Sequence, residues 1–378
     1  DPNPAKQYDL PPIAPQLWHA YHIAGDQMVV GILAALIHRL HTGEGQDLSV
    51  AIHEAVSKNT ELDVMSWVMR RAPLFRQTCR HAIEKPTHVP SIGHTKDGRW
   101  YIAAGVSVRD QTNLVPFLTG YGMAADLQEP SKEADTKARN IPGSGADDEK
   151  KSHMMEIVQR FIRSFRYEDM PWRDAQAAGL LWSPLRKPHE NVLDDHWRLR
   201  GTFSEIEHPE LGRACHYPVS RWLSTETSWK AGRRAPLLGE HTEAVLGKLA
   251  PRAPLTQPAR PRQTTPSKLS PHNKPFPLQG VRIFDFSWFL ASAGGTRFAA
   301  ALGADVIKVE PPGGDDVRNI SPGPVPGMSG VFVNVNRGKR SVVLDIKSAK
   351  GKEALRQMIA GADVFIHSMR AKAIARQG

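Results

Sequence analysis

Residues 281–312 carry the pattern that most constrains the fold of this chain. An apolar run at 281–286 favours a β-strand, and Gly303 precedes a second run of the same kind. Between them, residues 293–295 predict a glycine-bearing turn, and the alanine-rich residues 296–302 predict a helix. Strand, helix and strand in this order predict a βαβ unit of a Rossmann-like parallel sheet. Such a unit binds its ligand where the first strand meets the helix.

A proline-rich segment divides the chain into two parts. Residues 251–277 hold eight prolines and few bulky apolar residues, a composition typical of a stiff, solvated linker. We therefore expect a linker at 250–277 between folding units at 1–249 and 278–378. A chain of 378 residues with 40% hydrophobic composition can bury more than one core, in agreement with this division.

The part before the linker predicts helices and a second, smaller domain. Apolar residues recur at helical spacing over residues 17–40, and a second helix is expected over about 52–69, after a short strand at 46–50. Residues 91–104 read as a β-hairpin. We expect this hairpin to belong to a mixed α+β domain at about 85–170, so the fold class is α/β with a smaller mixed domain.

Charge and cysteine content narrow the classes of function. The net charge is +10, but Lys and Arg are spread widely and no basic run alternates with aromatic residues. We therefore expect no nucleic-acid partner and interpret the charge as a basic surface. The alternative is that part of the charge serves a polyanionic ligand, such as a nucleotide with several phosphates. Cys79 and Cys215 are far apart in sequence, which argues against a disulfide framework or zinc site and favours the cytoplasm. No run reads as the ~20 apolar residues of a membrane span, so no membrane partner is expected.

Short motifs on both sides of the linker resemble the class III CoA-transferases, the family of formyl-CoA transferase and carnitine CoA-transferase. After the linker, the matching motifs stand at 280–285 (GVRIFD), 302–313 (LGADVIKVEPPG), 336–341 (NRGKRS), 344–347 (LDIK) and 362–364 (ADV). Before it, they stand at 31–36 (GILAAL), 42–46 (TGEGQ) and 235–242 (APLLGEHT). The first set resembles the opening of the family and the second set its later part.

The resemblance implies a tandem arrangement. Residues 1–249 would be the later part of one copy, and residues 278–378 the N-terminal, Rossmann-like part of a second copy. Because members of this family interlock as dimers, the resemblance implies an interlocked dimer or an intramolecular pseudo-dimer.

The resemblance also implies an activity. Members move coenzyme A from an acyl-CoA to a carboxylic acid, and an aspartate attacks the thioester to give a mixed anhydride. The segment that carries this aspartate in relatives matches neither part of the chain, so we expect the catalytic aspartate to lie outside it. Asp1 and Asp9 lack the family's sequence context, and we assign no catalytic residue. The implied partners are an acyl-CoA and a carboxylic acid. Coenzyme A is a substrate here, and neither a resident cofactor nor a metal is expected.

The residues implied to contact coenzyme A fall in three places. The first strand–helix turn supplies Leu290 and Ala291, and the nucleotide side supplies Leu344, Asp345, Ile346 and Lys347. A third group consists of Ser368, Met369, Arg370 and Arg376. Lys347 could pair with a phosphate as a point charge. Ser368 and Met369 replace an Asn-Phe pair that is common in relatives.

Each of these residues also has an ordinary interpretation. Lys347 and Arg376 could be solvated surface charges, and Asp345 could cap the N-terminus of a helix. At the level of function, three alternatives stay open. The chain could be an acyl-CoA racemase of the same superfamily, or a non-catalytic CoA-binding or scaffolding half. A nucleotide-dependent oxidoreductase is disfavoured because the turn lacks GxGxxG spacing.

Overall fold

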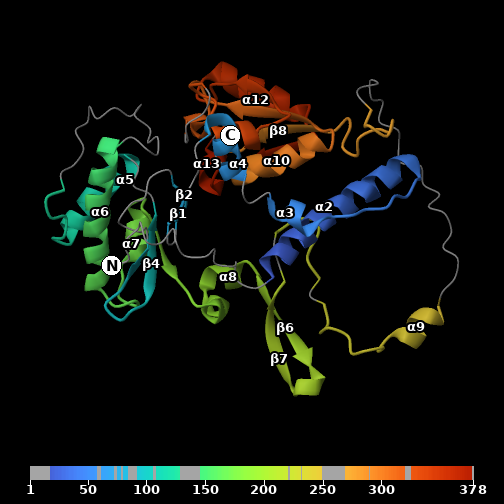
Figure 1. Cartoon of the computed structure of the whole chain (residues 1–378), viewed down its shortest axis with the longest axis horizontal. Helices are drawn as coiled ribbons and strands as arrows, with labels where there is room; N and C mark the ends of the chain where they lie inside the picture. The colour runs from blue at the N-terminus through green and yellow to red at the C-terminus, as the bar shows by residue number, and fades with distance from the viewer. Residues whose placement is uncertain are drawn as a thin grey trace.

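The chain folds into a mixed α/β structure, seen in a computed structural model (Figure 1). The structure describes residues 18–57, 61–71, 75–77, 80–83, 92–104, 108–127, 145–219, 222–230, 232–248, 269–288, 290–319 and 325–376. Within these residues one sheet is parallel and the other three are antiparallel.

The parallel sheet lies in the last hundred residues, as the sequence predicts. It has the strand order β10-β9-β8-β11, and every neighbouring pair is parallel. The strands are β8 (Arg282–Phe286), β9 (Asp305–Glu310), β10 (Arg340–Val343) and β11 (Val364–His367). The helices beside them are α10 (Ala291–Ala301), α11 (Gly330–Val335), α12 (Ala349–Ala360) and α13 (Ala371–Ala375), with the 3-10 turn η4 (Asp316–Asn319). With β8 as the first strand, this is the 3-2-1-4 order of a doubly wound sheet.

Helix α10 begins earlier than the sequence suggests. The predicted turn at 293–295 is helical, because the backbone N–H of Gly294 donates to the carbonyl of Leu290 at 2.8 Å. Strand β8 therefore ends at Phe286 and α10 begins at Ala291. Ile283 and Val306 form the core beneath this helix, at 7% and 1% exposure.

The hairpin predicted at 91–104 belongs to a second, smaller body with its own core, which runs from residue 92 to residue 185 (Figure 1). The predicted hairpin is confirmed as β3 (Ile92–His94) and β4 (Trp100–Ala104), and β5 (Leu181–Leu185) pairs with β4. The helices α5 (Val108–Gly120), α6 (Gly145–Ser164) and α7 (Trp172–Ala177) complete this body. Leu118 and Phe161 are fully buried at its centre. Because β5 adds the third strand of the sheet, the body extends beyond the expected boundary at about 170.

The first part of the chain contains α2 (His19–Thr42), as predicted. The helix expected over about 52–69 is described as α3 (Ile52–Ser57) and α4 (Glu61–Arg70), and residues 58–60 between them lie outside the described residues. The short strand expected at 46–50 is absent, because no described strand pairs with these residues. Two short antiparallel pairs follow, namely β1 (Phe75–Gln77) with β2 (Arg80–Ile83), and β6 (Phe203–His208) with β7 (Arg213–Pro218).

Helix α2 is more apolar than the sequence analysis allowed. By length and composition alone it could cross a membrane, since its most apolar window has a mean hydropathy of 1.5. The expectation that nothing approaches such a run is therefore corrected for His19–Thr42, by length and composition only. Only 6% of that window is buried, so α2 presents its apolar side chains at the surface.

The two parts of the chain touch each other. Helix α4 packs against α11, where a Cβ atom on Gly330 would lie 3.3 Å from the Cβ of Met65. Lys274, just before the parallel sheet, forms an ion pair of 2.8 Å with Glu44. The other described elements are α8 (Asp195–Leu199), α9 (Thr242–Leu246) and the 3-10 turns η2 (Pro188–Leu193) and η3 (Pro209–Leu211).

Candidate functional site

The carboxyl ends of β8 and β11 form the candidate site. Strands β8 and β11 are neighbours in the sheet. The next strand along the chain, β9, pairs with the opposite edge of β8. A doubly wound sheet binds ligands at this point, where the strand order reverses. The hydroxyl of Ser368 accepts a hydrogen bond of 2.7 Å from the backbone N–H of Trp288. Two of the predicted contact groups, Leu290–Ala291 and Ser368–Arg370, therefore follow strands that are joined at this edge.

The predicted nucleotide-side group, Leu344 to Lys347, forms a turn between β10 and α12. The backbone N–H of Leu344 donates to the carbonyl of Glu310 at 2.8 Å. A carboxylate oxygen of Asp345 accepts from the N–H of Lys347 at 3.0 Å. Asp345 is therefore not the helix cap, because its side chain closes this turn. Ser348 caps α12 instead, by accepting from the N–H of Gly351 at 3.0 Å.

An apolar cavity of about 360 Å³ adjoins this turn. Ile346 lines it together with Phe365 of β11. One face of α12 and the end of α13 complete the wall, through Lys352, Leu355, Arg356, Ile359, Ile374 and Ala375. The cavity therefore connects the Leu344–Lys347 turn with the segment after β11. Arg376 directly follows this wall at the end of α13, and both Lys347 and Arg376 are exposed.

A buried polar network lies beneath the turn from β8 to α10. Asp285 is fully buried and accepts from the N–H of Ser287 at 2.9 Å, from Thr296 Oγ1 at 2.6 Å and from the Ser287 hydroxyl. Lys339 Nζ lies 2.8 Å from the same carboxylate. Burial raises the pKa of Asp285, but Lys339 and the hydroxyl donors outweigh burial and hold the pKa below its ordinary value. Asp285 is therefore ionised and its charge is matched by Lys339.

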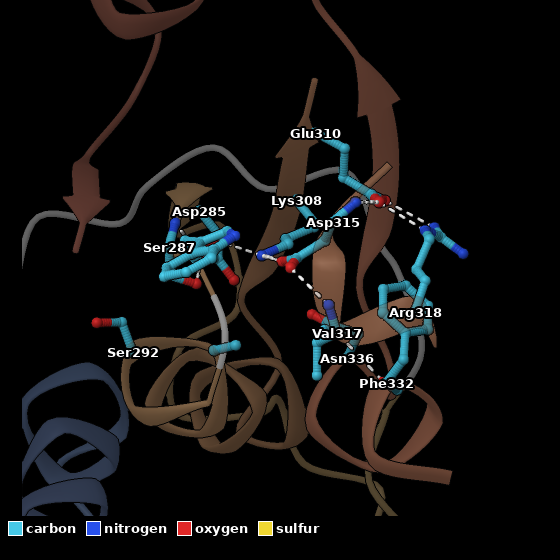
Figure 2. A network of polar contacts seen from close by, with 12 residues as sticks. Asp285, Ser287, Ser292, Lys308, Glu310, Asp315, Val317, Arg318, Phe332 and Asn336 are labelled. Atoms are coloured by element: carbon cyan, nitrogen blue, oxygen red, sulfur yellow. Dashed lines mark hydrogen bonds and ion pairs between the residues drawn. The ribbon is translucent and has the colours of Figure 1, made fainter. Parts of the chain in front are cut away.

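A second set of pairs extends the network along β9 (Figure 2). Lys308 pairs with Asp315 at 2.7 Å, and the side chains of both residues are 2% exposed. Glu310 accepts from Arg318 at 2.6 and 2.7 Å and from Ser341 at 2.7 Å. Burial raises the pKa of Glu310, yet these hydrogen bonds lower the pKa to about 2. The carboxylate therefore stays ionised at neutral pH.

Sequence reasoning missed this network. Lys308 and Glu310 stand in an apolar strand of a parallel sheet, and Lys339 stands in a turn motif. Strands of such sheets are buried on both faces, and buried Lys and Glu require partners. The alternation of charge with Val306, Ile307 and Val309 is the signal that could have predicted the pairs.

In the described part of the chain, no group of three or more His, Cys, Asp or Glu side chains gathers as a metal site. Cys215 is a free thiol on β7, and Cys79 lies outside the described residues.

Comparison with known families decides the affiliation. The sequence model described as CoA-transferase family III matches residues 5–242 and 278–378. The chain belongs to CoA-transferase family III. The unmatched stretch between the two segments contains the proline-rich residues 251–277.

Several CoA-transferases are similar over part of this family III chain. The succinate–glutarate CoA-transferase of Agrobacterium fabrum is 38% identical over 115 residues, which are 29% of this chain and 28% of the relative. The succinyl-CoA:glutarate CoA-transferase of Mus musculus is 43% identical over 93 residues, which are 24% and 21% of the two chains. A crystal structure of a CaiB/BaiF family protein from Brucella suis shows 36% identity over 28% of this chain and 29% of that one, with a TM-score of 0.26. The chain thus spans about a quarter of the length of the curated relatives that it matches.

Proposed function

We propose that this protein is an enzyme that moves coenzyme A from an acyl-CoA to a carboxylic acid and holds the acyl-CoA at the carboxyl edge of the parallel sheet. The observation that carries the proposal is the junction at this edge. There, Ser368 after β11 bonds to Trp288 after β8, and the Leu344–Lys347 turn shares a cavity with the segment after β11. Family membership, and relatives named as CoA-transferases, support coenzyme A as the ligand.

In this proposal each contact group meets one part of the ligand. The Leu290–Ala291 turn approaches the ligand with its backbone, while Lys347 and Arg376 supply positive charge for phosphates. The apolar cavity beside Ile346 has room for a flat base. Because coenzyme A is a substrate in this scheme, the protein would need no resident cofactor.

For the chemistry we propose the covalent route of the family. An aspartate carboxylate attacks the thioester carbonyl carbon, the C–S bond breaks, and coenzyme A leaves as the thiolate. Asp285 and Asp315 are each paired with a buried lysine, so we assign neither as the nucleophile. A non-catalytic CoA-binding half is the second candidate, because Ser368 and Met369 stand where relatives commonly carry Asn-Phe.

The role of Lys347 gives the proposal a direct test. Replacing Lys347 by alanine should weaken the binding of free coenzyme A about fivefold at low salt, because a phosphate loses its counter-charge. The difference should shrink at high ionic strength, since the pair is exposed and screened. Titration calorimetry of the whole chain measures both effects. Lys350→Ala, another exposed lysine near the start of α12, is the matched control and should bind as the wild type does. Equal affinity of all three chains would contradict the assigned phosphate contact.

We also propose that a second CoA-transferase unit covers α2 in the cytoplasmic enzyme, as in an interlocked dimer or an intramolecular pseudo-dimer. The exposed apolar side chains of this helix support it, since they present a surface that association would bury. They are Tyr21, Val29, Val30, Ile32, Leu33, Leu36 and Leu40, which are 39% to 59% exposed.

Sedimentation equilibrium tests the two-chain form of this assembly. The wild-type chain should have twice its mass of 41.8 kDa, and a variant with Leu33→Glu and Leu36→Glu should have the mass of one chain. A wild-type mass of 41.8 kDa would rule out a pair of these chains.

A further inference from the structure

Two buried ammonium groups hold the turn between β8 and α10 from beneath. Lys308 on β9 donates to the carbonyl oxygen of Ser287, at the start of the turn. Lys339, just before β10, donates at 2.8 Å to the carbonyl oxygen of Ala293, in the first turn of α10. The two contacts therefore bracket Leu290 and Ala291. Figure 2 shows Lys308 pointing toward Ser287 and Asp315.

Each ammonium group is fixed in turn by a buried carboxylate. Lys308 pairs with Asp315, and Lys339 pairs with Asp285 at 2.8 Å and with Asn336 Oδ1 at 3.0 Å. The four charged side chains are at most 2% exposed. Desolvating such pairs costs so much that apolar residues of similar volume are often equally stabilising. Fold stability alone therefore does not explain two such pairs under one turn, whereas a requirement for one defined backbone geometry does.

We propose that Lys308 and Lys339 are positioning residues that fix Ser287 and Ala293, on the two sides of the Leu290–Ala291 contact group, in the geometry that coenzyme A requires. The inference rests on the proposed function, in which Leu290 and Ala291 contact that ligand. Neither lysine touches the ligand in this scheme, and both act through the carbonyl groups that they hold. A turn that is ordered before the ligand arrives loses less conformational freedom on binding, which raises affinity.

The test removes each pair without leaving a buried charge behind. The double variants Lys339→Met/Asp285→Asn and Lys308→Met/Asp315→Asn are titrated with free coenzyme A, and amide hydrogen exchange is measured on the unliganded chains. We expect affinity to fall on the order of tenfold in each variant. Amides at 287–293 should exchange faster, because the carbonyl of Ser287 loses its donor in the Lys308 variant and the carbonyl of Ala293 loses its donor in the Lys339 variant.

A matched control separates positioning from general destabilisation. Arg99 and Glu190 form a pair of 2.7 Å in the smaller body, away from the turn. The variant Arg99→Met/Glu190→Gln should lower stability and leave both coenzyme A affinity and exchange at 287–293 unchanged. Equal losses of affinity in the control and in the two lysine variants would overturn the inference.

The remaining outcomes distinguish the inference from the function on which it rests. Wild-type affinity and unchanged exchange at 287–293 in both lysine variants would overturn the positioning role and leave the proposed function standing. A wild-type chain that binds no coenzyme A would contradict the proposed function. In that case exchange alone decides whether the lysines hold the turn: faster exchange at 287–293 supports it, and unchanged exchange refutes it.

Discussion

Replacing Asp285 by alanine is expected to lower the free energy of unfolding by roughly 3–5 kcal/mol. The substitution leaves the Lys339 ammonium group buried, with its side chain 1% exposed, and without its counter-charge. It also removes the acceptor for Thr296 and for the backbone N–H of Ser287. Unsatisfied buried donors add to the cost of the orphaned charge. Urea denaturation followed by circular dichroism at pH 7 measures the change.

Asp305 on the same sheet supplies the control for this prediction. Its carboxylate pairs with Arg340 at 2.7 Å and with Arg282 at 3.3 Å, but its side chain is 35% exposed. Surface pairs of this kind contribute about 0–1 kcal/mol, so Asp305→Ala should change stability little. Similar losses in Asp285→Ala and Asp305→Ala would contradict the special cost of the buried pair.

Replacing Gly351 by alanine is expected to destabilise the sheet by about 1–3 kcal/mol and to weaken coenzyme A binding. A Cβ atom at this position would overlap the carbonyl oxygen of Asp345 and lie 2.6 Å from its carbonyl carbon. Both are backbone atoms of the 344–347 turn, so either the turn or the start of α12 must move. Because Lys347 belongs to that turn, the shift should also displace its proposed phosphate contact. Urea denaturation and calorimetric titration with coenzyme A measure the two effects.

Gly295 is the matched control within a helix. It is exposed in α10, and a Cβ atom there meets nothing within 4 Å. Alanine is the better helix former, so Gly295→Ala should raise stability by about 0.5–1 kcal/mol. If Gly351→Ala also raised the free energy of unfolding, the 344–347 turn would have to move aside at no energetic cost. That result would contradict the close packing of Gly351 against Asp345.

The elements that the sequence predicts correctly are those with strong local patterns. The apolar run before Ser287 predicts a strand, and β8 ends at Phe286. The helical spacing over residues 17–40 predicts a helix, and α2 covers His19–Thr42. The failures arise where distant residues decide the outcome. Residues 46–50 have strand-like composition, but no strand among the described residues pairs with them. Gly294 joins α10 because Leu290 accepts its N–H.

The candidate site was predictable only in part. The motifs placed the contact groups at the ends of strands, and parallel pairing puts those ends at one edge. Nothing local could show that Ser368 bonds to Trp288, because 80 positions separate the two residues. The turn at Asp345 and the cap at Ser348 are local contacts, and the sequence offered Asp345 as the cap in place of Ser348. The pairing of Lys339 with Asp285 is also a long-range contact, since 54 positions separate the two residues.

Hydrogen exchange with and without coenzyme A tests the central claim most directly, because it locates the ligand on the whole chain. Saturating coenzyme A should slow amide exchange at 287–293, 344–347 and 368–376, and leave the β6–β7 hairpin unchanged. Identical exchange at all three segments with and without coenzyme A, or protection confined to the β6–β7 hairpin, would contradict the binding site proposed at the carboxyl edge of the parallel sheet.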